Sequence, residues 1–290
     1  MRAGPGLRAL AAVIAAVLAG GCAAVPVAGH PGLTSGPLGY WDRSRLLGAR
    51  PLREPGYRLA PMPGQSANAR PATLALRVGA LFVRGGSSDH FCTASVVASP
   101  GRDLLITAAH CIHTGKGGGY RQDIVFVPDY RDGQEPFGVW TVERLVVAPQ
   151  WISDSDPDLD VGFVVLAPHD GQNIEDILGA NRLGFDPGYQ NLVHVTGYPS
   201  SADAPITCIN WTSRQSATQL RFECGGFTGG TSGSPWVTHF NRRTRTGTII
   251  GVIGGYQEGG DTDAISYSPY LGPAIQRLYE QAIAEETAKA

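Results

Sequence analysis

The chain has 290 residues, of which 42% are hydrophobic and 17% are charged; this is enough for one large domain or for two packed barrels with extensions. There are 23 Lys and Arg against 25 Asp and Glu, a formal net charge of −2, so no basic excess indicates a nucleic-acid partner. Glycine (39 residues) and proline (21 residues) are frequent, which favours turns over long helices.

Residues 1–21 have the pattern of an export signal. Arg2 and Arg8 precede an apolar run at residues 10–18 that is too short to span a bilayer. Small residues then lead to Cys22, as in a bacterial lipobox, so we expect Cys22 to be lipidated. Ordinary cleavage a few residues further on is the alternative. The protein is therefore expected to be exported, as a cell-surface lipoprotein or in secreted form, with membrane contact only through this lipid.

Residues 22–72 differ from the rest of the chain in composition. They are rich in Pro, Gly and Arg and have no sustained apolar period. This composition predicts a largely disordered tether or propeptide and does not distinguish between the two roles. Tyr40 and Trp41 form the only aromatic pair there and can dock on the domain that follows.

From residue 73 onwards, short β-branched runs alternate with Gly, Pro and Ser turns. This rhythm predicts many short strands in a sandwich or barrel. After the signal, only residues 272–285 place apolar side chains at helical spacing and predict a helix. The expected strands are residues 78–83, 93–97, 104–107, 124–127, 139–147, 161–166, 192–197, 219–224, 234–238 and 248–253.

Two short motifs carry the chemistry. The run T-A-A-H-C ends with His110 beside Cys111, and the run G-T-S-G-S-P places Ser232 between glycines. A serine hydroxyl becomes a strong nucleophile when a neighbouring base takes its proton. The segment between the motifs supplies an acid, Asp160, followed by an apolar strand. Histidine, aspartate and serine in this chain order are one of the known arrangements of the catalytic triad.

Asp158 competes with Asp160 for the role of the acid. We favour Asp160, because the alternative would place an unpaired charge in a buried strand. Together with Asp154 and Asp156 these residues also suggest a calcium loop. However, the sixth position is Leu159 rather than Gly and the twelfth is not Glu, so the first three aspartates are interpreted as a solvated loop and no metal or other cofactor is expected.

The two motifs resemble those of the chymotrypsin-like (trypsin-fold) serine proteases, in the bacterial branch that contains the glutamyl endopeptidases. The resemblance covers about residues 77–280. It implies an all-β fold of two packed six-stranded antiparallel β-barrels, at about residues 73–170 and 180–270, with a C-terminal helix. The order of the triad residues and the absence of G-x-S-x-G argue against an α/β-hydrolase.

The same resemblance implies further roles for individual residues. The backbone N–H groups of Gly230 and Ser232 would form the oxyanion hole. Five cysteines leave four to pair if Cys22 carries lipid, and four cysteines allow three connectivities. The family pattern selects Cys92–Cys111, which clamps the histidine loop, and Cys208–Cys224, which closes a hairpin before the serine loop.

The substrate pocket departs from the family's familiar forms. Gly226 stands where trypsins place a pocket Asp, and Ile253 stands where glutamyl endopeptidases place a His. A pocket formed by Thr228, Ile253, Gly254 and Gly255 would favour an uncharged side chain.

The sequence therefore predicts an exported, monomeric serine endopeptidase that acts on protein or peptide substrates. The alternative, from another class, is a protease-fold binding protein at the cell surface with weak or no turnover.

Overall fold

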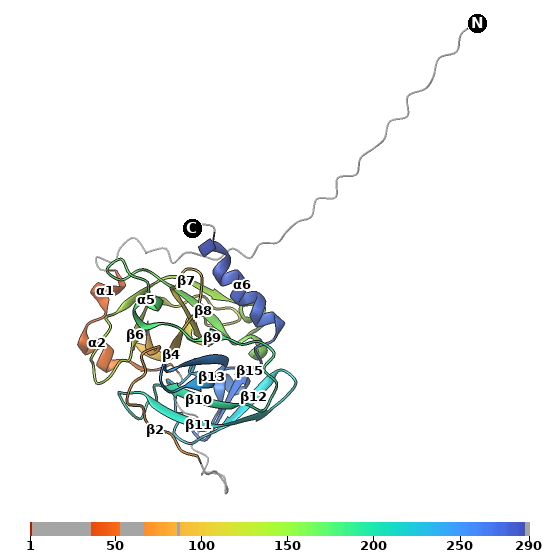
Figure 1. The fold of residues 1–290 in the computed structure, drawn as a ribbon. Coiled ribbons are helices and arrows are strands. Elements are labelled where there is room, and N and C mark those ends of the chain that lie inside the picture. Colours follow the sequence, from red (N-terminus) through yellow and green to blue (C-terminus); the bar gives the residue numbers. More distant parts are fainter. Residues whose placement is uncertain (2–35, 53–66, 86–87, 288–290) are drawn as a thin grey trace.

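The computed structural model describes residue 1 and residues 36–52, 67–85 and 88–287. The expected export signal and the lipidation site Cys22 lie outside the described residues. Two β-sheets lie one above the other, and the C-terminal helix α6 runs along the first of them (Figure 1). Among the described residues, no helix is long and apolar enough to cross a membrane.

The first sheet closes into a barrel of six antiparallel strands in the order β4-β3-β6-β7-β8-β5, because β5 also pairs with β4. Alternating apolar residues of these strands fill the interior, with Phe126 and Trp140 among the largest fully buried side chains. The strands are β3 (Val78–Arg84), β4 (His90–Val97), β5 (Leu104–Thr107), β6 (Gln122–Pro128), β7 (Trp140–Val147) and β8 (Gly162–Leu166).

The second sheet contains six antiparallel strands in the order β15-β12-β11-β10-β13-β14, with two short strands at its margins. Between β14 and β15 the described residues form no ladder. Instead, the Val252 N–H donates to Ser268 Oγ and the Gly254 N–H to the Tyr267 carbonyl. The strands are β10 (Leu192–Gly197), β11 (Ile206–Arg214), β12 (Gln219–Glu223), β13 (Pro235–Asn241), β14 (Thr246–Val252), β15 (Ile265–Pro269), β2 (Arg70–Pro71) beside β11, and β9 (Arg182–Leu183) beside β14.

Helix α6 (Pro273–Thr287) follows the second sheet in sequence but packs against the first barrel. Ile275 and Leu278 share a buried cluster with Phe163, and Arg144 Nη2 donates to the Ala282 carbonyl at 2.7 Å. The expected all-β, two-barrel architecture with a C-terminal helix is confirmed. The other helical segments are α1 (Pro37–Tyr40), α2 (Arg43–Gly48), α3 (Ala109–Ile112), α4 (Pro149–Asp154), η1 (Pro157–Leu159), α5 (Ile174–Leu178) and η2 (Tyr256–Gly259).

Part of the N-terminal segment lies on the first barrel. Strand β1 (Arg50–Pro51) pairs in parallel with β4. Trp41 is buried and its Nε1 donates to the Asp123 carbonyl at 2.7 Å, while the Tyr40 hydroxyl donates to Asp89 at 2.8 Å. The aromatic pair is therefore docked on the domain, and residues 36–52 have a defined place beside β4 and β6.

Both expected disulfides are formed. Cys92–Cys111 joins β4 to the short helix α3, and Cys208–Cys224 joins β11 to a residue just after β12. The second bridge closes a loop with a sequence separation of 16 around the β11–β12 hairpin.

Replacing Cys208 and Cys224 together by alanine is expected to lower the free energy of unfolding by about 3 kcal/mol, because the unfolded chain regains the entropy of an open loop. Urea denaturation of the variant and the parent, followed by tryptophan fluorescence, measures this difference. A loss below about 1 kcal/mol would contradict the prediction.

Candidate active site

The pairing of β5 with β8 brings His110 and Asp160 together. Thr107 at the end of β5 lies opposite Gly162 at the start of β8, so α3 and Asp160, two residues before β8, meet at one end of the barrel. His110 Nδ1 lies 2.8 Å from Asp160 Oδ2, and the His110 N–H donates to Asp160 Oδ1 at 2.9 Å. A carboxylate only accepts hydrogen bonds, so Nδ1 carries the proton and Nε2 is left with a lone pair.

Asp160 is completely buried and is also held from the second barrel. The Gly255 N–H donates to Asp160 Oδ2 at 2.8 Å. Burial by itself would raise the pKa of the Asp160 carboxyl, but the charge and hydrogen bonds of His110 and the bond from Gly255 outweigh it, so this pKa lies below its ordinary value. A Cβ at Gly254 would lie 3.0 Å from Asp160 Oδ2, so glycine there permits the close approach.

The loop that carries Ser232 lies against the strands of the first barrel. The Thr93 N–H donates to the Ser232 carbonyl at 2.8 Å. Gly233 has φ +84°, and a Cβ there would lie 2.0 Å from the Thr93 carbonyl oxygen and 2.2 Å from Thr107 Oγ1. Only glycine fits this conformation and this spacing. The serine loop therefore contacts the residues that lead into His110.

The N–H groups expected to bind an anion are available. In the described part of the chain, the N–H groups of Gly230 and Ser232 donate to no other group. The loop itself is fixed, since the Gly230 carbonyl accepts from Thr93 Oγ1 at 3.0 Å and Ser234 Oγ donates to the Thr231 carbonyl at 2.6 Å. His110 Nε2 is likewise buried without a described hydrogen-bond partner. Ser232 Oγ and His110 Nε2 are therefore not hydrogen-bonded to each other, although the serine loop lies against the strands that lead into His110.

The four residues expected in the substrate pocket have different surroundings. Thr228 is partly exposed and its Oγ1 accepts a hydrogen bond from Ser200 Oγ at 3.1 Å. Ile253 is buried and belongs to the hydrophobic cluster of the second barrel. Gly254 and Gly255 border Asp160 instead, as described above. The structure thus separates these residues into a partly exposed threonine, a core isoleucine and two glycines that support the acid.

The aspartates that suggested a calcium loop do not converge on one point. Asp154 is exposed, Asp156 accepts from the Asp158 N–H at the start of η1, and Asp158 accepts from Gln219 Nε2 at 2.7 Å. Asp160 faces His110. Each carboxylate has its own partner or faces solvent.

One group of possible metal ligands exists among the described residues, formed by Cys92, His110 and Cys111. The two cysteines are joined by the disulfide, and a metal ion binds cysteine as the free thiolate. This group is therefore not a metal site.

Two supporting residues were missed by the sequence analysis. Thr93 links the serine loop to the first barrel, as described above. Gln219 is buried and donates to the Pro157 carbonyl at 3.0 Å while its Oε1 accepts from the Tyr256 N–H at 3.1 Å. It thus joins the acid loop to η2. A polar side chain inside a strand-forming run was the only available signal for either residue.

The chain belongs to the trypsin family, whose model matches residues 65–269. It is similar to the crystal structure of the protease Anisep from Arthrobacter nicotinovorans, at 27% identity and a TM-score of 0.67, over 74% of this chain and 99% of that one. A thermostable serine protease, AL20, from an extremophilic microorganism is also 27% identical, with a TM-score of 0.66 over 72% and 98% of the two chains.

A Glu endopeptidase shares the fold at 15% identity and a TM-score of 0.59, over 76% of this chain and 98% of that one. No curated protein matches the chain. These relatives confirm the expected chymotrypsin-like fold, and their class supports a protease.

Replacing Asp160 with asparagine is expected to lower kcat/KM roughly 10⁴-fold, because an amide at this position no longer holds Nδ1 protonated or stabilises the imidazolium. Asp158→Asn is the matched control, since it changes the same functional group two residues away and an asparagine can still accept from Gln219. Steady-state kinetics on one peptide substrate compares the two. Equal losses of kcat/KM in the two variants would contradict the assignment of the acid's role to Asp160 alone.

Proposed function

We propose that this protein is an exported serine endopeptidase with Ser232 as nucleophile, His110 as general base and Asp160 as the orienting acid. The bond between His110 Nδ1 and the buried Asp160 is the observation that carries the proposal, because it leaves Nε2 to act on the serine. Membership of a family of serine proteases supports the same chemistry.

In the proposed reaction, Ser232 Oγ attacks the carbonyl carbon of the scissile peptide bond as its proton passes to His110 Nε2. The N–H groups of Gly230 and Ser232 stabilise the negative charge on the carbonyl oxygen, a contribution of about 3–4 kcal/mol to the transition state. Nε2 then protonates the leaving amine and the C–N bond breaks, giving an acyl-enzyme. Water, deprotonated by Nε2, hydrolyses the ester and restores Ser232.

The N-terminal segment extends this proposal to the way in which a substrate reaches His110. Residues 36–52 are held on the first barrel, and Leu52 lines the same cavity of about 460 Å³ as His110, Arg121 and Gly255. The Leu52 N–H donates to the Phe91 carbonyl at 3.1 Å. We infer that this segment restricts approach to His110 while it remains attached, the behaviour of a propeptide more than of a simple tether.

A fluorophosphonate probe is expected to label the parent chain, because the probe reacts with serines activated by a base. Ser232→Ala should not be labelled, whereas Ser213→Ala, on the exposed face of β11, should behave as the parent does. Labelling should be faster in a chain that begins at residue 67 if the N-terminal segment restricts access. No labelling of either folded chain would favour the alternative of a binding protein.

We further propose that the substrate residue on the N-terminal side of the cleaved bond has an uncharged side chain. Gly226, with φ +103°, offers no charge where trypsins place an acid. Profiling with a peptide library should give apolar or small residues at the cleaved position. A profile dominated by Glu, Lys or Arg would contradict this, and Thr228→Val would identify whether the hydroxyl contributes to the preference.

A further inference from the structure

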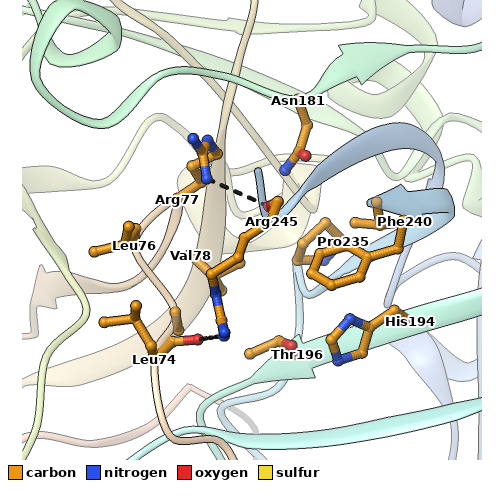
Figure 2. A pocket seen from close by; sticks show the side chains of 12 residues that line it. Leu74, Leu76, Arg77, Val78, Asn181, His194, Thr196, Pro235, Phe240 and Arg245 are labelled. Atoms are coloured by element: carbon orange, nitrogen blue, oxygen red, sulfur yellow. Dashed lines mark hydrogen bonds between the residues drawn. The ribbon is translucent and has the colours of Figure 1, made fainter. Parts of the chain in front are cut away.

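A basic cavity that shares no lining residue with the site around His110 lies on the second barrel. One wall of the cavity is β2 and the segment that follows it, and the other is formed by β10, β11 and the β13–β14 hairpin. The cavity has a volume of about 270 Å³. A smaller cavity continues it past Arg245 (Figure 2). We call it the arginine pocket and define it by Arg70, Arg242, Arg245, His194, Thr196 and Thr207.

The charge of the arginine pocket is uncompensated. No carboxylate lines it, and in the described part of the chain none of Arg70, Arg242 and Arg245 forms an ion pair. Burial lowers the pKa of His194 most, and the charges of these three arginines lower it further, to about 4. Like charges that face one cavity destabilise the fold unless an anion joins them.

Arg245 is held in place to face the cavity. Its Nη2 donates to the Leu74 carbonyl, and its own carbonyl accepts from Arg77 Nη1 at 3.3 Å (Figure 2). Its backbone has φ +57° in the turn between β13 and β14, where the Arg245 N–H donates to the Asn241 carbonyl at 2.6 Å. Arg77 Nε, behind it, is buried without a described hydrogen-bond partner.

The remaining walls indicate the shape of a ligand. Thr196 and Thr207 bring hydroxyl groups 3.0 Å apart, and the rings of His194 and Phe240 meet edge to face at 4.3 Å between centroids. Ile209 adds an apolar surface. The cavity is therefore larger than a bare oxyanion and is polar and cationic on one side and apolar on the other.

We propose that the arginine pocket binds a phosphate or sulfate group carried on a small organic body. Guanidinium groups bind tetrahedral oxyanions through paired charge-assisted hydrogen bonds. The organic part lies against Phe240 and Ile209. This function is independent of peptide hydrolysis and requires none of His110, Asp160 and Ser232.

Calorimetry with phenyl phosphate at low ionic strength tests the proposal, with inorganic phosphate, inorganic sulfate and neutral benzyl alcohol as further arms. The Ser232→Ala chain is used, so that self-digestion does not interfere and binding is judged apart from catalysis. The phosphate ester is expected to bind. NMR titration should then show that the pKa of His194 rises from about 4. The reason is that the bound anion offsets the charges of Arg70, Arg242 and Arg245, while Thr196 and Thr207 stay neutral.

Two hairpin arginines provide a matched pair of variants. Both are exposed, but Arg242 lines the pocket and Arg243 does not. Arg242→Gln should weaken phenyl phosphate binding about tenfold, and Arg243→Gln should leave it unchanged. Similar affinity for inorganic phosphate would support the oxyanion site with a free anion as its source, and tighter binding of the ester would support an organic ligand. Absence of heat and of a His194 shift at about 10 mM ligand, or equal weakening in both variants, would overturn the proposal.

Discussion

The buried carboxylate of Asp160 is the interaction on which the rest of the site depends. An unpaired charge at this depth would cost several kcal/mol, so the carboxylate needs several hydrogen-bond donors. The donors come from both barrels: the ring and backbone of His110 from the first, and the Gly255 N–H from the second. The same three bonds that make the charge tolerable also fix the imidazole and join the two halves of the molecule.

The serine loop is held by an equally specific contact across the barrel interface. Thr93 donates its backbone N–H to the Ser232 carbonyl and its hydroxyl to the Gly230 carbonyl, while Gly233 lies too close to Thr93 and Thr107 for any side chain. With its carbonyl groups engaged in this way, the loop keeps the N–H groups of Gly230 and Ser232 free. Packing of the first barrel thus determines the geometry of a loop that belongs to the second.

Local patterns predicted most of the fold because its strands are short and strongly apolar. β11 and β15 were missed as strands, since Thr207, Thr212, Ser266 and Ser268 are polar residues buried within them. Their hydroxyls find partners only in the folded sheet, as Ser268 does with the Val252 N–H. Likewise, the sequence showed that Trp41 can dock but not where, because its place depends on a pocket built by distant strands.

The sequence by itself determined the identities and the order of the chemical groups: the histidine, aspartate and serine motifs, the cysteines and the glycines that the loops require. These signals are local, because the conformations of glycine and the chemistry of a side chain belong to single residues or short runs. Only the tertiary structure decided that Gly254 and Gly255 support the acid, that Leu52 lines one cavity with His110 and that Arg70, Arg242 and Arg245 face another. Each of these depends on which strands become neighbours, and neighbours in space are set by packing between residues far apart in the chain.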